Sequence, residues 1–355
     1  MELQNLFPAD GHLLTAFAES RIGGRQENQD SYGCCKTKYG YLFTVCDGMG
    51  GGPGGKTAST IAVREIVDGI ANAESDEAVP NIIIKAIRRA NMTIIERGDE
   101  DAALKGMGAT ATVLLVSEQS AFVAHVGDSR VYQIRGRHKV FRTFDHSLVF
   151  EMVSQKVITE EQARLSAQSN VITRALGVKP DLEVDITELP YERGDRFILC
   201  TDGIHGSMPE NELVRMVSDH SGTLGALVDD VATYVDNIGR SSGGGHDNLT
   251  LAMIEMHINS KLKEKMSRKV KVIVCGLAAV VAASVLLNVV QCSNGSGSVK
   301  ALENACDTIV QLRNENAVLQ HKVQNVDSLV GRHGEKKVQE AEKTLKEIKK
   351  ILESK

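Results

Sequence analysis

Short apolar runs rich in β-branched and aromatic residues constrain the fold of residues 1–258 most strongly. They predict β-strands over residues 41–46, 110–117, 121–127, 196–200 and 249–258. Between them, apolar residues recur at helical spacing and predict amphipathic helices over residues 57–72, 78–97, 210–218 and 223–238. Strands and helices come in groups instead of alternating strictly. The pattern therefore favours an α+β layered domain over a doubly wound parallel sheet.

Charge is distributed unevenly along the chain. The 355 residues include 41 Lys+Arg and 46 Asp+Glu, which gives a net charge of −5. In residues 1–260 acidic residues outnumber basic ones by 36 to 24, whereas residues 261–355 are basic overall. The acidic body argues against nucleic acid as a partner and fits a protein that gathers carboxylates around cations. With 42% hydrophobic and 25% charged residues, the composition excludes a wholly disordered or fibrous chain.

The cysteines and the N-terminus indicate the cellular compartment in which the protein would fold. The chain has 7 cysteines, without CxxC spacing, so we interpret them as reduced thiols that mostly pack in the core. The first residues contain no basic stretch followed by an apolar run, so no signal peptide is predicted.

Residues 272–290 form a run of 19 residues without a charged side chain. As a helix this run would cover roughly 28 Å, close to the ~30 Å hydrocarbon core of a bilayer. We expect a single transmembrane helix, and a buried core helix is the alternative. Basic residues crowd only the preceding flank, residues 259–271. The positive-inside rule then predicts a single-pass membrane protein with residues 1–258 in the cytoplasm and the C-terminal tail on the outer side.

The C-terminal segment has a heptad pattern. It follows a Ser/Gly-rich linker over residues 291–298. Over residues 299–355 apolar residues recur at spacings of three and four, interrupted by Asn316 at a core position. A lone asparagine there is typical of a parallel two-stranded coiled coil, so the tail is predicted to form a parallel homodimer. A single amphipathic helix lying on another domain is the alternative.

Four Asp residues sit next to Gly, or close to it, at the ends of apolar runs. They occur in VCDGMGG (45–51), VGDSR (126–130), CTDGIHG (200–206) and GGHDNLT (244–250). A single Asp beside a Gly is only a turn signal. Four on separate strands would repel one another in a shared site unless a divalent cation with oxygen ligands neutralised them. The lack of His/Cys clusters argues against zinc.

These motifs, in this order, resemble the bacterial form of the metal-dependent serine/threonine protein phosphatases, the protein phosphatase 2C class. The resemblance covers about residues 12–258. It begins with SRIGGRQENQDSY (20–32) and VCDGMGG, and continues with KGMGATAT (105–112), VGDSRVY (126–132), DHSLV (145–149) and NVITRALG (170–177). It ends with the TDG and HDNLT motifs. The resemblance implies a four-layer αββα sandwich, in which two stacked, mainly antiparallel sheets are flanked by helices.

The resemblance also implies a two-metal site for Mn²⁺ or Mg²⁺. Asp47 would bridge the two ions and help to catalyse hydrolysis. Asp202 and Asp247 would complete the ligands of one ion, and the carbonyl of Gly48 would help to hold the other. Asp128, together with Asp202, matches a third and weaker metal site of bacterial relatives. The implied reaction is hydrolysis of a phosphate monoester by water activated between the metals.

Two further residues take their roles from the same resemblance. Arg25 stands in the phosphate-binding position, where its planar guanidinium would bind phosphate oxygens. Asp30 would support the metal centre by accepting hydrogen bonds from its water. Met49 stands where some eukaryotic relatives carry a His suggested as the general acid, so the general acid is unassigned.

The resulting hypothesis is a membrane-anchored phosphatase that acts on phosphoserine and phosphothreonine in proteins and opposes a cytoplasmic Ser/Thr kinase. Two alternatives belong to other classes. The body could be a catalytically silent signalling scaffold, or the chain could be mainly a structural coiled-coil element of the membrane. A scaffold would be expected to have lost metal ligands, and Asp47, Asp202 and Asp247 are all present.

Overall fold

The computed structural model describes residues 3–7, 12–51, 53–74 and 77–262, which belong to one compact unit, Met1–Glu264. The predicted transmembrane helix (272–290), Ser/Gly linker (291–298) and coiled-coil tail (299–355) lie outside the described residues. So does most of the basic segment 259–271. In the part of the chain that the structure does describe, no helix is both long and apolar enough to cross a bilayer.

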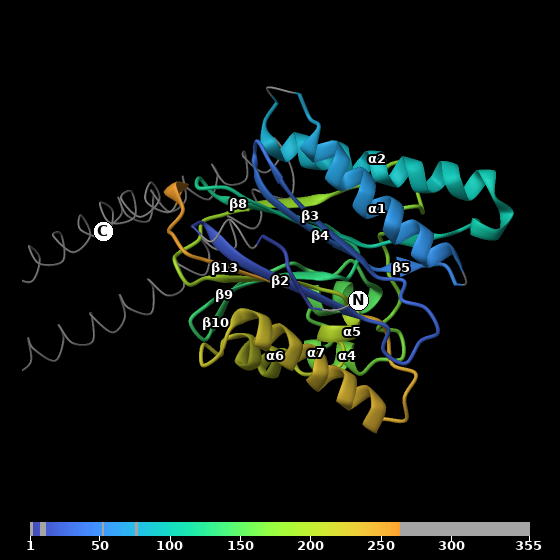
Figure 1. Ribbon diagram of the computed structural model, residues 1–355. Helices are drawn as coiled ribbons and strands as arrows, with labels where there is room; N and C mark the ends of the chain where they lie inside the picture. Colours follow the sequence, from blue (N-terminus) through green and yellow to red (C-terminus); the bar gives the residue numbers. More distant parts are fainter. Residues whose placement is uncertain (1–2, 8–11, 52, 75–76, 263–355) are drawn as a thin grey trace, which may run out of the picture. The chain divides into compact units, whose positions relative to one another are not determined.

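Two antiparallel sheets form the centre of the molecule (Figure 1). The first sheet has the order β1-β2-β13-β12-β9-β10. Its strands are β1 (Gln4–Asn5), β2 (Leu14–Arg21), β9 (Arg130–Arg135), β10 (His138–Arg142), β12 (Arg196–Cys200) and β13 (Leu249–Met256). The second sheet has the order β11-β8-β7-β4-β3. Its strands are β3 (Ser31–Thr37), β4 (Gly40–Cys46), β7 (Ala111–Val116), β8 (Ala121–Val126) and β11 (Asp185–Leu189).

Helices cover both outer faces of this pair of sheets. Figure 1 shows α1 (Pro53–Ala71) and α2 (Val79–Glu100) over the second sheet, and α6 (Glu210–Val217) and α7 (Leu224–Ser241) over the first. Shorter elements lie near the ends of the strands. They are the 3₁₀ turn Ala102–Leu104, the β5 (Gly48–Met49) and β6 (Gly108–Ala109) pair, α3 (Leu148–Ser154), α4 (Glu160–Arg164) and α5 (Asp202–His205).

Three apolar cores separate the four layers. One lies between the second sheet and α1 and α2, one between the two sheets, and one between the first sheet and α6 and α7. Neighbouring residues of one strand serve different cores: Phe197 packs between the sheets, whereas Ile198 packs toward α7. Strands buried on both faces read as continuous apolar runs, which is why they stand out in the sequence. The predicted four-layer αββα arrangement is confirmed.

The apolar runs and helical periodicities correspond to β4, β7, β8, β12 and β13 and to α1, α2, α6 and α7. Six strands of the two sheets were not predicted, namely β1, β2, β3, β9, β10 and β11. Strand β9 has the sequence RVYQIR and buries Arg130 and Gln133. Both side chains are buried because they find polar partners, Asp145 for Arg130 and Asp195 for Gln133. A strand with buried polar residues lacks the apolar pattern on which sequence prediction depends.

Candidate active site

The predicted site residues gather at one end of the sandwich. Asp47 directly follows β4, Asp128 follows β8, and Asp202 begins α5 after β12. Asp30 directly precedes β3, and Asp247 lies shortly before β13. The register places these strand ends together, because Ser31 pairs with Cys46 and Leu251 with Cys200. We call Asp30, Asp47, Asp128, Asp202 and Asp247 the carboxylate cluster.

Two hydrogen bonds with Thr110 fix the backbone of Asp47 at the end of β4. Its N–H donates to Thr110 Oγ1 at 2.9 Å, and the N–H of Thr110 donates to the Asp47 carbonyl at 2.8 Å. Thr110 Oγ1 also lies 2.7 Å from Ser129 Oγ, beside Asp128. The Asp47 and Asp128 loops are therefore joined through one buried threonine.

Gly48 lies where the backbone is too crowded for any side chain. A Cβ at Gly48 would lie 2.0 Å from the carbonyl oxygen of Gly55 at the start of α1. Only glycine allows this close approach. The main chain of Gly48 is thus held between Asp47 and the first turn of α1.

Asp30 is almost fully buried, with 1% of its surface exposed. Thr250 and Thr201 donate hydrogen bonds to its Oδ2 at 2.6 and 3.0 Å. Burial raises the pKa of Asp30 to about 7, against the lowering effect of these two hydrogen bonds. The charges of Asp202 and Asp247 raise it further.

Three other carboxylates of the cluster, those of Asp47, Asp128 and Asp202, show the same conflict between burial and charge. Burial, followed by the charge of Asp30, holds the pKa of Asp47 well above its usual range. Burial and Asp247 raise the pKa of Asp202 to about 6. Burial, with Asp202 and Asp145, also raises the pKa of Asp128. A bound cation would remove this mutual repulsion.

The residues present fit a divalent cation. Asp202 Oδ1 is buried and has no hydrogen-bond partner among the described residues, although such atoms are normally satisfied. In the described part of the chain, Asp47, Asp128 and Asp202 form no ion pair with a basic side chain. The donor set is oxygen only, which suits Mg²⁺ or Mn²⁺.

Arg25 lies at the rim of the cluster. Its Nη2 donates to Asp247 Oδ2 at 2.8 Å, and the two side chains are 50% and 38% exposed. An exposed pair of this kind holds its partners weakly. The guanidinium is therefore available to a ligand that approaches from solvent.

A cleft of about 420 Å³ adjoins the cluster. Asp128, Asp202 and Asp247 line one side, and Val149, Phe150, Ala163 and Arg164 from α3 and α4 line another. Helices α3 and α4 belong to residues 145–177, the stretch bracketed by the DHSLV and NVITRALG motifs, which we call the flap segment.

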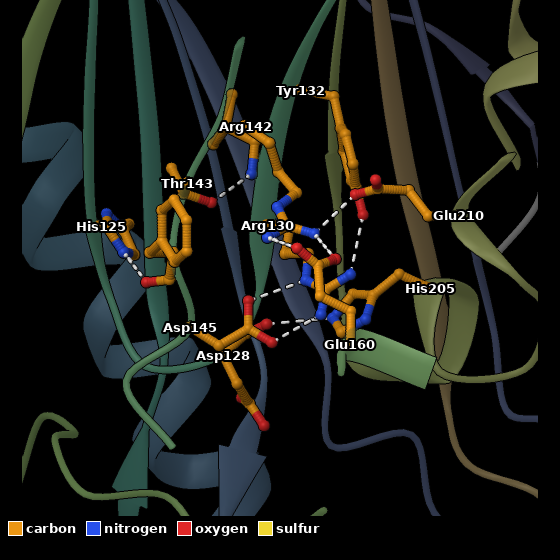
Figure 2. A network of polar contacts seen from close by, with 12 residues as sticks. His125, Asp128, Arg130, Tyr132, Arg142, Thr143, Asp145, Glu160, His205 and Glu210 are labelled. Carbon is orange, nitrogen blue, oxygen red and sulfur yellow. Dashed lines mark hydrogen bonds and ion pairs between the residues drawn. The ribbon is translucent and has the colours of Figure 1, made fainter. Parts of the chain in front are cut away.

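An ion-pair network connects the flap segment to the first sheet (Figure 2). Arg130 makes a bidentate pair with Asp145, with both distances 2.7 Å and both side chains buried. Arg142 pairs with Glu160 at 2.6 Å and with Glu210 at 2.7 Å, and Lys139 also pairs with Glu210. We call these six residues the ion-pair network. Its members were not singled out from the sequence, because their partners lie far apart along the chain.

His125, His146 and Asp185 form a second group with metal-ligand side chains, and their candidate atoms lie within 4.8 Å of one another. However, Gly127 N–H donates to His146 Nδ1 at 3.1 Å, so a neutral His146 carries its proton on Nε2 and cannot offer that atom to a metal. The guanidinium of Arg174 also lies 3.2 Å from Nε2 and 3.1 Å from Asp185 Oδ1. The group therefore belongs to a set of contacts that fasten the ends of the flap segment.

Two free cysteines among the described residues lie in the core, as expected from the sequence. Cys46 and Cys200 are free and fully buried on strands, and burial raises the pKa of each thiol to about 12. They are core residues and not nucleophiles. His246 bonds to Asp236 at 2.8 Å, which fits an ordinary rim residue. His205 is buried, with 7% of its surface exposed.

Comparison with known proteins decides the family. The family model described as Protein phosphatase 2C matches residues 19–236. The chain belongs to the protein phosphatase 2C family. The serine/threonine phosphatase stp of Listeria monocytogenes is 31% identical over 241 residues, which cover 67% of this chain and 93% of that protein. The protein phosphatase PhpP of Streptococcus pneumoniae is 32% identical over 250 residues, which cover 69% of this chain and 96% of that protein.

Solved structures agree with this assignment. The serine/threonine phosphatase Stp1 from Staphylococcus aureus superposes with a TM-score of 0.63 at 29% identity, covering 69% of this chain and 96% of that one. The catalytic domain of the phosphatase PstP, solved in complex with two manganese ions, has a TM-score of 0.58 at 25% identity, with coverage of 69% and 99%. This chain is therefore a serine/threonine phosphatase of the protein phosphatase 2C type.

Proposed function

We propose that this phosphatase hydrolyses phosphoserine and phosphothreonine in proteins, and that it requires two Mn²⁺ or Mg²⁺ ions. The observation that carries the proposal is the carboxylate cluster. Its aspartates are crowded together at the strand ends, the pKa values of Asp47 and Asp202 are raised, and Asp202 Oδ1 lacks a hydrogen-bond partner among the described residues. A protein that kept such a cluster without a cation would lose stability with no compensating gain. The structure of PstP with two manganese ions supports the proposal by analogy.

The roles of the chain's own residues follow from their positions. Asp47, Asp202, Asp247 and the Gly48 carbonyl would hold the two ions. Divalent cations there would neutralise phosphate charge and lower the pKa of an attacking water. Asp128 and Asp202 would hold a third ion.

Arg25 and Asp30 have separate roles. Arg25 would exchange its exposed contact with Asp247 for the phosphate oxygens of the substrate, which its planar guanidinium can bind in pairs. Asp30 would keep the centre oriented, since two threonine hydroxyls, from Thr201 and Thr250, fix its carboxyl group. Removing Thr250 Oγ1 would therefore loosen Asp30 without touching a metal ligand.

The test is hydrolysis of p-nitrophenyl phosphate and of a phosphothreonine peptide by the full-length protein. It is run with Mn²⁺, with EDTA, and with the variants Asp47→Asn and Asp202→Asn. We expect activity that needs Mn²⁺ and is lost in both variants. Folded protein that turns over neither substrate at any Mn²⁺ concentration would favour the scaffold hypothesis instead.

We also propose, from the sequence, that residues 272–290 anchor the enzyme in a membrane with its catalytic domain in the cytoplasm, where it would oppose a Ser/Thr kinase. The support is the uncharged run and its one-sided basic flank. Alkaline carbonate extraction should leave the full chain in the membrane pellet. Release of the full chain into the supernatant would count against the anchor.

A further inference from the structure

His205 joins two members of the carboxylate cluster that come from different strands. It is the last residue of α5, the four-residue helix that begins at Asp202. Its Nε2 lies 3.0 Å from the carbonyl oxygen of Asp128. Both residues appear in Figure 2, beside the ion-pair network. One side chain thus connects the backbone that carries Asp128 to the helix that carries Asp202.

The nature of the acceptor makes this contact directional. A carbonyl oxygen can only accept a hydrogen bond, so the ring nitrogen that faces it must carry a proton. His205 therefore carries a proton on Nε2 and donates a hydrogen bond to the carbonyl oxygen of Asp128. Because Nε2 is used in this way, it is not a metal ligand.

Both ends of the connection are rigid. A Cβ at Gly203 would lie 1.9 Å from the carbonyl oxygen of Asn248, so α5 is pressed against the strand that follows Asp247. On the other side, the backbone N–H of His146 donates to the Gly127 carbonyl at 2.9 Å, and the Gly127 N–H donates to the ring Nδ1 of His146 at 3.1 Å. Ser129 bonds to Thr110. Each of the two backbone segments is held by its own contacts. The hydrogen bond from His205 joins them and can therefore set the distance between Asp128 and Asp202.

We infer that His205 is a positioning residue that sets the separation of the Asp128 and Asp202 carboxylates, and through it the affinity of the third divalent cation. The inference rests on the proposed function, because it takes both aspartates as metal ligands. Asp202 is also proposed to hold one of the two principal ions, but His205 bonds to the backbone of Asp128, which is proposed to hold only the third ion, whereas Asp47 is held through Thr110. The main effect is therefore expected at the third ion. Residues that orient metal ligands typically change metal affinity by about 10- to 100-fold when removed.

The experiment is Mn²⁺ titration of the full-length protein by isothermal calorimetry, together with Mn²⁺ dependence of p-nitrophenyl phosphate hydrolysis. The variants are His205→Ala, His205→Gln and Ser207→Ala. Glutamine keeps an N–H donor near the position of Nε2. Ser207→Ala is the matched control, because Ser207 Oγ donates to the Gly203 carbonyl at 2.7 Å in the same turn without reaching Asp128.

We expect His205→Ala to weaken only the lowest-affinity Mn²⁺ by about 10- to 100-fold. His205→Gln should recover most of this loss, and Ser207→Ala should bind like the wild type. Equal binding by His205→Ala and wild type, or equal weakening of all ions, would overturn the inference. So would a wild type that binds two Mn²⁺ and no third, which would leave the proposed function intact. A wild type that binds no Mn²⁺ would refute both.

Discussion

The carboxylate cluster and the ion-pair network lie side by side and differ in how their charges are balanced. In the network every carboxylate has a basic partner, as Asp145 has Arg130 and Glu160 has Arg142. In the cluster, Asp47, Asp128 and Asp202 have neighbours of their own sign, and burial and repulsion raise their pKa values. Each group has buried members, Asp30 and Asp128 in the cluster and Arg130 and Asp145 in the network, so burial alone does not separate them.

The comparison teaches that charge balance distinguishes a structural polar group from a functional one. A buried ion pair that is fully hydrogen-bonded specifies one arrangement of the chain. A buried group of like charges costs free energy and persists only if something else compensates it. The network fastens the flap segment to the first sheet, and the cluster is the cation site that we propose. The first two predictions below expect opposite effects on stability.

The largest effect is expected for Asp47→Asn. Phosphatase activity should fall by more than ~100-fold, beyond the range seen for residues that merely support a metal ligand. The metal-free variant should be more stable than the metal-free wild type, because one of the mutually repelling carboxylates is gone. Initial rates with Mn²⁺ and urea unfolding in EDTA measure the two effects. An active variant, or one that is less stable without metal, would contradict the assignment of Asp47.

Breaking the network should give the reverse result for stability. Asp145→Asn leaves the buried guanidinium of Arg130 without its counter-charge, and we expect a loss of about 3–5 kcal/mol in the free energy of unfolding. The double variant Arg130→Met with Asp145→Leu should recover part of this loss, since an apolar pair leaves no charge unpaired. Urea unfolding of both variants provides the measurement. An Asp145→Asn variant as stable as the wild type would show that the Arg130–Asp145 pair is not buried as described.

The pH dependence of the metal-free protein should reveal the cluster directly. Asp30 has a pKa of about 7 and Asp202 of about 6, both above their usual value of 3.8. The folded state therefore retains protons that the unfolded state has released. Stability in EDTA should fall as pH rises from about 4 through these pKa values. Saturating Mn²⁺ should remove most of that decline, so thermal unfolding with Mn²⁺ and with EDTA across this range is the comparison to make. A flat profile in EDTA would argue against a strained cluster.

The smallest effect is expected at the edge of the network. Lys139 pairs with Glu210, but its side chain is 32% exposed, and Arg142 also pairs with Glu210. Lys139→Ala should cost less than about 1 kcal/mol, as exposed pairs usually do. Its phosphatase activity should equal that of the wild type. A loss of unfolding free energy comparable to that of Asp145→Asn would mean that the network acts as one unit.

Much of the fold was predictable because buried strands and amphipathic helices leave regular patterns. Strands β4 and β12 read as apolar runs, and Asp47 and Asp202 were found because they follow those runs beside glycine. Strand β9 and the Arg130–Asp145 pair were not predicted, because a buried arginine looks like an exposed one until its partner is known. The same limit applies to His205, whose contact with Asp128 spans 77 positions of the chain. The roles of the aspartates in metal binding stay predictions.

The most direct test of the central claim is the number of Mn²⁺ ions bound per chain at pH 7.5. It should be measured by equilibrium dialysis for the wild type, Asp47→Asn and Glu210→Gln. We predict at least two ions for the wild type and for Glu210→Gln, whose change lies in the ion-pair network, and fewer for Asp47→Asn. A wild type that binds fewer than two ions, or a loss in Glu210→Gln equal to that in Asp47→Asn, would contradict the distinction between the two groups.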